Sequence, residues 1–518
     1  MQTDSVTSYD ELPYHSNPFH YTHPDALATA AILAGLEPPD VQRCRVLELG
    51  CAGGGNLIPM AEGLPESKFV GIDLSARQVA QGQAIIDALK LQNIRLKAMS
   101  IMDVTPEFGQ FDYIICHGVY SWVPPAVQEK ILEICNVNLS RNGVAYVSYN
   151  TYPGWHMRQM IREMMLFHVE QIRDPRQRVR EALTLLDMLV HSAGTHDTPY
   201  AQLLKEEMET LQSAGEHYVF HEHLEDINEP LYFHQFVKRA AAKGLQYLGE
   251  AQSYEGAGRI DPSAAQWLMQ QTKDAVRREQ YCDFIMSRRF RWTLLCHNDQ
   301  AVDHTPDPRR VEKLQITAIL NCSTPDPDLR SDAKVTFVSP KNVEMTSDNP
   351  IVKGALAALI RHKPAAISFD TLCQEIQRLA RGTDEPMREA DRQFAAGAML
   401  QCHHSGTVEL HTYLPPFTLK VSERPKAMLM ARLQAGDQAL ITSRRHRIIH
   451  LNPFDFQVLI LLDGTRDRAA LLKAIEAAVT SGELGIKDKE GKAPDPSVLP
   501  DLLDHSLRRI AFAALLVE

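Results

Sequence analysis

Apolar residues over the first three hundred positions form short runs that are separated by longer amphipathic stretches. The short runs predict strands, and the longer stretches, with apolar residues three or four apart, predict helices. Strands that alternate with helices favour a doubly wound α/β fold. We therefore expect a seven-stranded sheet whose last strand is antiparallel, built from residues 46–49, 68–72, 94–99, 111–116, 143–149, 246–250 and 290–296.

The turn after the first strand is rich in glycine, with four glycines among residues 50–55. Glycine lets a ligand approach the backbone closely, and the helix that follows presents free N–H groups. The turn lacks the G-x-G-x-x-G spacing of a dinucleotide site. Instead Glu48 lies two residues before Gly50, and the run resembles the E-x-G-x-G-x-G motif of class I S-adenosylmethionine (SAM) methyltransferases, with Ala52 in place of the middle glycine.

The ends of the next two strands complete the predicted cofactor site. Asp73 ends the second strand, where a carboxylate can accept both hydroxyl groups of an adenosine ribose. The third strand leads to residues 100–103, where this fold places the adenine, although Asp103 also fits a plain turn residue. We predict that SAM, which leaves as S-adenosyl-L-homocysteine, contacts Glu48, Gly50, Cys51, Ala52, Gly54, Asn56, Asp73, Leu74, Ser100, Ile101, Met102, Asp103 and His117.

The fourth and fifth strands end in segments that are dense in aromatic residues, although only 7% of the chain is aromatic. Open α/β sheets bind ligands beyond the carboxyl ends of their strands. Aromatic faces attract sulfonium and methylammonium groups alike. For any single ring, packing in the core or in a lid is the alternative. We predict that the methyl acceptor meets His117, Tyr120, Trp122, Tyr149, Tyr152 and Trp155.

The residues after the fourth strand exclude two acceptor classes. The run His117-Gly118-Val119-Tyr120 is neither the [D/N/S]-P-P-[Y/F/W] motif of amino-methylating nucleic-acid enzymes nor the Pro-Cys of cytosine-C5 enzymes. An amine needs little base assistance once desolvation has lowered its pKa. These residues therefore favour an N-methyltransferase.

The composition limits the classes of partner and the cellular location that we expect. The net charge of -11 disfavours a protein whose main work is gripping nucleic-acid phosphates. The nine cysteines include no C-x-x-C pair, and no run approaches the 18 apolar residues of a membrane span. A secretory signal is also unsupported, so we expect a cytoplasmic protein.

The remaining residues predict further units. We expect the SAM-binding core in residues 1–155, a helical cap in 156–219, and the end of the sheet with a regulatory segment in 220–330. The cap would shape substrate access or form a homodimer face, and packing in the core alone is the alternative. Residues 331–425 have the element order of a winged helix, and residues 426–518 predict a further α+β unit. For this C-terminal region we favour interaction or dimerisation over DNA binding.

Histidines and acids gather at residues 221–225, in a segment that we interpret as extended, where His221 and His223 share one side. Because the H-E-x-x-H spacing is absent, we prefer a hydrogen-bonding or substrate-lining role to a metal site.

Several motifs together resemble one bacterial family. They are SYDELPYHSNPFHYTHP, LELGCAGGGNLIPMA, HGVYSWVP, YNTYPGW and HEHLEDINEPLYFHQF. Over roughly residues 8–300 the chain looks like the methyltransferases with a methyltransferase regulatory domain, a group that includes lysine methyltransferases of outer-membrane proteins. The resemblance implies SAM as donor and a protein lysine as acceptor. It also implies that Tyr14, Phe19, Thr22 and His23 fold over the cofactor.

We therefore expect a SAM-dependent N-methyltransferase that acts on protein lysine. Two alternatives stay open at this point. A small-molecule methyltransferase would have a closed pocket under the helical cap, and a SAM-binding regulator would bind the cofactor without turnover.

Overall fold

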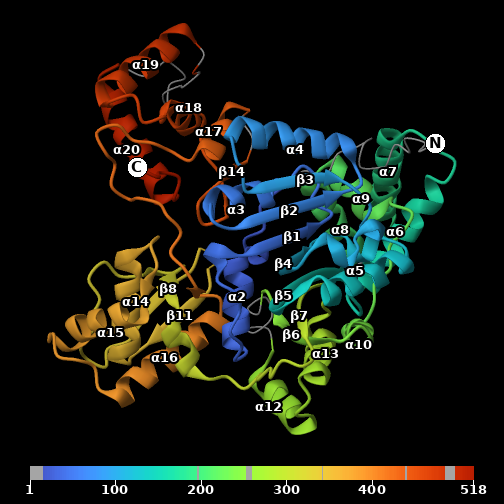
Figure 1. The fold of residues 1–518 in the computed structure, drawn as a ribbon, viewed down its shortest axis with the longest axis horizontal. Helices are drawn as coiled ribbons and strands as arrows, with labels where there is room; N and C mark the ends of the chain where they lie inside the picture. The colour runs from blue at the N-terminus through green and yellow to red at the C-terminus, as the bar shows by residue number, and fades with distance from the viewer. Residues whose placement is uncertain are drawn as a thin grey trace.

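The computed structural model describes residues 16–194, 198–252, 260–340, 342–437, 440–482, 484 and 496–518. Its centre is a seven-stranded sheet in the order β3-β2-β1-β4-β5-β7-β6, in which β7 runs antiparallel to both of its neighbours (Figure 1). The predicted sheet is therefore confirmed, and its strands are β1 Arg45–Leu49, β2 Lys68–Asp73, β3 Ile94–Ala98, β4 Phe111–Cys116, β5 Leu139–Asn150, β6 Leu245–Glu250 and β7 Phe290–His297.

Each face of the sheet has its own hydrophobic core. On one side, which we call the α2 face, Tyr113 and Tyr146 pack under α2 Pro24–Leu33, α3 Leu57–Gly63 and α4 Ala76–Leu89. On the other side, which we call the α5 face, Ile114 and Val147 pack under α5 Pro125–Val137 and α10 Phe233–Ala242. Successive residues of a strand point to opposite faces, so each strand serves both cores.

The predicted cap is a group of four helices after β5, with a core of its own. They are α6 Trp155–His168, α7 Pro175–Ala193, α8 Pro199–Ala214 and α9 Glu216–His223. Inside it, Arg158 and His223 both contact the buried carboxylate of Glu207. Two further helices, α12 Pro262–Gln271 and α13 Ala275–Met286, lie between β6 and β7 along the chain.

The extended conformation expected around residue 221 is wrong, because His221 and His223 lie in α9. Residues two apart on a helix point to different sides. His221 accordingly contacts Glu225 at 2.9 Å, whereas His223 contacts Glu207 at 3.0 Å. Within the described ranges, no three metal-ligating side chains come together.

The described residues beyond 300 form two more units with separate cores. The first contains β8 Gln315–Ala318, β9 Asn321–Cys322, β10 Val335–Val338, β11 Glu344–Ser347, α14 Pro350–His362, β12 Ile367–Ser368, α15 Phe369–Ile376, α16 Glu389–His404 and β13 Val408–His411. The second contains α17 Leu429–Gly436, β14 Ile441–Thr442, β15 Ile448–Ile449, α18 Pro453–Leu461, α19 Arg468–Ser481 and α20 Leu499–Phe512. Among the described helices, none is long and apolar enough to cross a membrane.

Candidate functional site

The glycine turn between β1 and α3 bends back over the end of β2. The amides of Gly50 and Cys51 both donate to the carbonyl of Ile72, at 2.9 and 3.0 Å. Gly50 has φ +75°, and a Cβ there would lie 2.5 Å from Val119 Cγ2, so this position requires glycine. Ala52 also has a positive φ of 48°, and its amide donates to Asp73 Oδ2 at 2.8 Å. The turn and the predicted ribose acid are thus held together.

The predicted ribose and adenine residues lie at one edge of the sheet. Asp73 pairs in register with Ala98, so the strand ends that carry Asp73 and residues 100–103 are adjacent. Residues 101–103 form a short 3-10 helix that begins with a hydrogen bond from Met102 N to Ser100 Oγ. Leu74 and Met102 are 65% and 48% exposed there. Two apolar side chains beside a carboxylate suit an adenosine, whose base they would cover.

Glu48 and Asn56 lie under the turn, buried. Asn56 Nδ2 donates to Glu48 Oε1 at 2.7 Å, while Glu48 Oε2 is buried and no described group bonds it. Burial raises the pKa of Glu48 to about 8. An unpartnered buried carboxylate oxygen beside this turn fits the ammonium group of a SAM methionine. The described residues of the cradle therefore fit the cofactor, although each individual contact stays a prediction.

The described part of the N-terminal arm, residues 16–23, covers the glycine turn. Gly55 N donates to Ser16 Oγ at 2.7 Å, and Phe19 N donates to Asn56 Oδ1 at 2.9 Å. Thr22 Oγ1 lies 3.0 Å from Asn56 Nδ2. His23 instead accepts from Asp25 N at the start of α2, and its ring stacks on Tyr413. Tyr14 lies outside the described residues.

His117 follows β4 on the α2 face, among rings from distant parts of the chain. Phe19 lies closest, with ring centroids 4.0 Å apart. Both Tyr146 Oη, at 2.8 Å, and Ser148 Oγ, at 3.1 Å, contact His117 Nδ1. Burial lowers the pKa of His117 to about 3, so the ring is neutral. We call this group the His117 cluster; its members are Phe19, Tyr21, His117, Tyr146, Phe290 and Trp292.

The aromatic residues predicted from the sequence do not form one rim with His117. Tyr120 and Tyr149 are fully buried in the core of the α5 face, where both rings pack on Phe236. Their predicted contact with an acceptor is therefore unsupported. The other three lie where β5 leads into the helical cap: Trp122 packs edge to face on Trp155, and Tyr152 stacks on His156.

Four members of the His117 cluster were missed from the sequence, namely Tyr21, Tyr146, Phe290 and Trp292. The alternation of a strand was the available signal, because Tyr146 lies an odd number of residues from Tyr149 and so points to the opposite face. That Phe290 and Trp292 join it depends on the pairing of β5 with β7, in which Ser148 faces Trp292.

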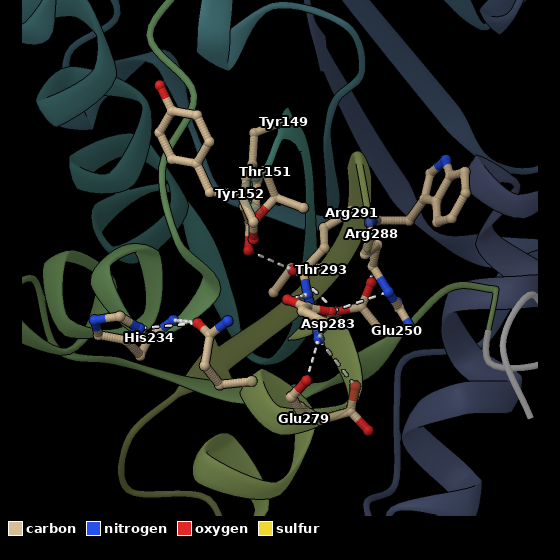
Figure 2. A network of polar contacts seen from close by, with 12 residues as sticks. Tyr149, Thr151, Tyr152, His234, Glu250, Glu279, Asp283, Arg288, Arg291 and Thr293 are labelled. Atoms are coloured by element: carbon tan, nitrogen blue, oxygen red, sulfur yellow. Dashed lines mark hydrogen bonds and ion pairs between the residues drawn. The ribbon is translucent and has the colours of Figure 1, made fainter. Parts of the chain in front are cut away.

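A buried ionic network holds β7 in place from the α5 face (Figure 2). Arg291 is fully buried; it donates to Asp283 at 2.8 and 2.9 Å and to Glu250 at 2.6 Å, and it reaches Glu279 as well. Its guanidinium lies 3.7 Å from the centre of the Phe233 ring. Because residues 290 and 292 flank Arg291, this network also fixes the two β7 rings that point to the α2 face.

A separate cavity of about 430 Å³ lies between α2, β6 and the C-terminal units. Tyr21 lines it on one side, and residues 444–447 line it on another. Its charges are largely paired: Glu409 holds Arg445 and Arg447, and Asp25 holds His411. No residue of α6 to α9 lines this cavity, so it is not the pocket under the cap that a small-molecule enzyme would have.

Family models match three parts of the chain. Residues 46–143 match a methyltransferase domain, residues 215–297 a predicted methyltransferase regulatory domain, and residues 423–515 the PKMT C-terminal winged helix domain. The winged helix model thus covers the second C-terminal unit. The sequence pattern instead predicts a winged helix in residues 331–425, which precede that unit.

Relatives extend the match to nearly the whole chain. An uncharacterized protein of Rickettsia prowazekii (strain Madrid E) is 37% identical over 98% of this chain and 93% of its own. The structure of PKMT2 from Rickettsia typhi is 33% identical, covers 98% of this chain and 100% of that one, and superposes with a TM-score of 0.88. The same protein in complex with AdoHcy superposes with a TM-score of 0.87. The chain therefore belongs to the family of SAM-dependent methyltransferases that combine a methyltransferase regulatory domain with a PKMT winged helix domain.

Proposed function

We propose that the protein transfers the methyl group of SAM to the side-chain amine of a lysine in a protein substrate. The similarity to PKMT2, a structure that holds AdoHcy, supports the donor and the class of acceptor. The single observation that supports an amine acceptor is the His117 cluster. It lies at the carboxyl end of β4, where open α/β sheets bind substrates.

The cluster suits an amine in three respects. Its ring faces attract a methylammonium product by cation–π interaction. His117 is neutral, so it does not repel an incoming ammonium group. Burial among rings also lowers the pKa of a lysine, which exposes the lone pair that methyl transfer needs.

Bound SAM would supply an electrophilic methyl group, and the residues of the chain would align the acceptor with it. Asp73 would hold the ribose, and the Gly50–Gly54 turn with Glu48 the methionine end. Ser148 Oγ accepts from Gly118 N at 2.8 Å and can donate to His117 Nδ1, which fixes the His117 ring. In-line displacement depends on such positioning.

Labelled SAM tests the proposal. The wild-type chain and Asp73→Ala are incubated with a lysate of the source organism, and labelled proteins are hydrolysed to identify the modified amino acid. Label in methyllysine with wild-type protein alone supports the proposal. Label in small metabolites, or cofactor binding without any turnover, would overturn it in favour of the small-molecule enzyme or the regulator.

We also propose a cytoplasmic homodimer in which the helical cap meets its copy. Phe167 on α6 is 82% exposed and Met188 on α7 is 53% exposed, so each side chain would bury apolar surface in such an interface. Light scattering on Phe167→Asp tests this, and an unchanged mass relative to the wild type would contradict it.

A further inference from the structure

The turn between β14 and β15 of the winged helix domain reaches the cofactor motif of the methyltransferase domain. His446 lies in this turn, is only 4% exposed, and contacts Asn56 Oδ1 through Nε2 at 2.9 Å. The two residues are 390 positions apart. Asn56 begins α3 directly after the glycine turn.

Asn56 is the point where three parts of the chain meet. Its Oδ1 accepts from Phe19 N of the arm and from His446, and its Nδ2 donates to Glu48 of β1. An amide oxygen can only accept, so His446 Nε2 carries the proton in this contact. The winged helix domain thus supplies one of the hydrogen bonds that orient the Asn56 amide.

The turn is built to present His446 in this position. Ser443 N donates to the carbonyl of Arg447 at 2.9 Å, and His446 N donates to the carbonyl of Ser443 at 2.9 Å. His446 has φ +53°, a left-handed conformation that costs energy for a residue with a Cβ. A strained backbone at a buried histidine is held by the surrounding contacts.

Through Asn56, the contact of His446 connects to the predicted cofactor site and to the His117 cluster. Asn56 holds Glu48 beneath the predicted methionine end of the cofactor, and it holds Phe19, whose ring lies 4.0 Å from His117. We propose that His446 is a positioning residue for the cofactor site: through Asn56 it keeps the glycine turn and the arm in the geometry that binds SAM. This inference rests on the proposed function, because it assigns SAM to that turn.

Three variants of the full chain test it. His446→Ala removes the hydrogen bond, and a lost buried hydrogen bond lowers an equilibrium constant by about tenfold. We expect SAM to bind about tenfold more weakly by calorimetry, with KM for SAM raised and kcat nearly unchanged. His446→Gln keeps an N–H donor at a similar reach and restores binding to within about threefold.

The matched control is Arg444→Ala. Arg444 lies in the same turn and contacts Glu62 of α3 at 3.6 Å, and the contacts of the described residues include no hydrogen bond from its side chain to Asn56. If His446 only holds the two domains together, both alanine variants weaken SAM binding alike and the inference fails. Equal affinity of wild type and His446→Ala also overturns it. A wild-type chain that does not bind SAM would instead overturn the proposed function.

Discussion

The two faces of the sheet contain the same residue types, but these residues make different contacts on each face. On the α5 face, Tyr149 is buried against Phe236 and its hydroxyl contacts Thr293 Oγ1 at 3.0 Å. On the α2 face, three residues earlier on the same strand, Tyr146 is equally buried but its hydroxyl contacts the neutral His117 at the strand ends. For these two tyrosines, the parity of the position in the strand decides whether the ring packs in the core of the α5 face or joins the His117 cluster.

Buried charge differs between the faces in the same way. On the α5 face, Asp283 and Glu250 both contact the Arg291 guanidinium, which compensates their burial. On the α2 face, Glu48 receives only the Asn56 amide and keeps one oxygen unpartnered among the described residues. A compensated network leaves its carboxylates paired within the protein, whereas an uncompensated carboxylate at a strand end is suited to a ligand.

The largest expected effect comes from Asp73, the predicted ribose acid, which lies at the edge of the sheet between the two faces. Asp73→Ala should weaken SAM binding by about a hundredfold or more, because each lost hydrogen bond to a charged group costs about 1.5–3 kcal/mol. Calorimetry measures it. Asp87→Ala, an exposed acid of α4, serves as the control and should bind SAM normally. An unchanged affinity in Asp73→Ala would remove the ribose assignment.

The next effect concerns a tryptophan of the α2 face. Trp292→Ala on the α2 face should lower kcat/KM for a lysine substrate by about tenfold or more, since a desolvated cation–π contact is worth about 2 kcal/mol. The dissociation constant of SAM should stay within about twofold. Trp267→Ala on α12, half-exposed and packed edge to face on Tyr281, provides the comparison. Equal losses of kcat/KM in the two variants would contradict the proposed acceptor site.

A smaller effect concerns the pH dependence of stability. Burial raises the pKa of Glu48 from 4.5 to about 8, so the folded state favours the protonated carboxyl. Its contribution to stability is full below about pH 4.5 and is lost as the pH rises through about 8. The unfolding temperature of the cofactor-free chain should therefore fall over this range by a few degrees more than that of Glu48→Gln. Parallel curves for the two proteins would contradict the buried, unpaired state of Glu48.

Local patterns predicted most of the fold. Strand runs such as 111–116 and the glycine turn depend on neighbours in sequence, so the seven strands, the antiparallel β7 and the SAM motif follow from them. The pattern around His221 predicts the wrong conformation because a short polar stretch carries no clear period. Its helix is stabilised by tertiary contacts such as that of His223 with Glu207.

The proposed acceptor site is harder to predict for a physical reason. His117 is a candidate because it directly follows a strand, but its neighbours come from the arm, from β5 and from β7. Trp292 lies 175 residues from His117 in the sequence, and only the pairing of β7 with β5 brings it near. The contact between His446 and Asn56 spans two domains and leaves no local signal at either end.

The most direct test of an acceptor site on the α2 face compares kcat/KM for lysine methylation in Tyr146→Phe and Tyr149→Phe. Both variants lose one buried hydroxyl and one hydrogen bond, on opposite faces of β5. We predict that Tyr146→Phe, in which His117 loses a partner, is about tenfold slower with unchanged SAM affinity. Tyr149→Phe should keep its rate within about twofold and lose only about 1 kcal/mol of stability. Equal rates in the two variants, or a slower Tyr149→Phe, would contradict an acceptor site on the α2 face.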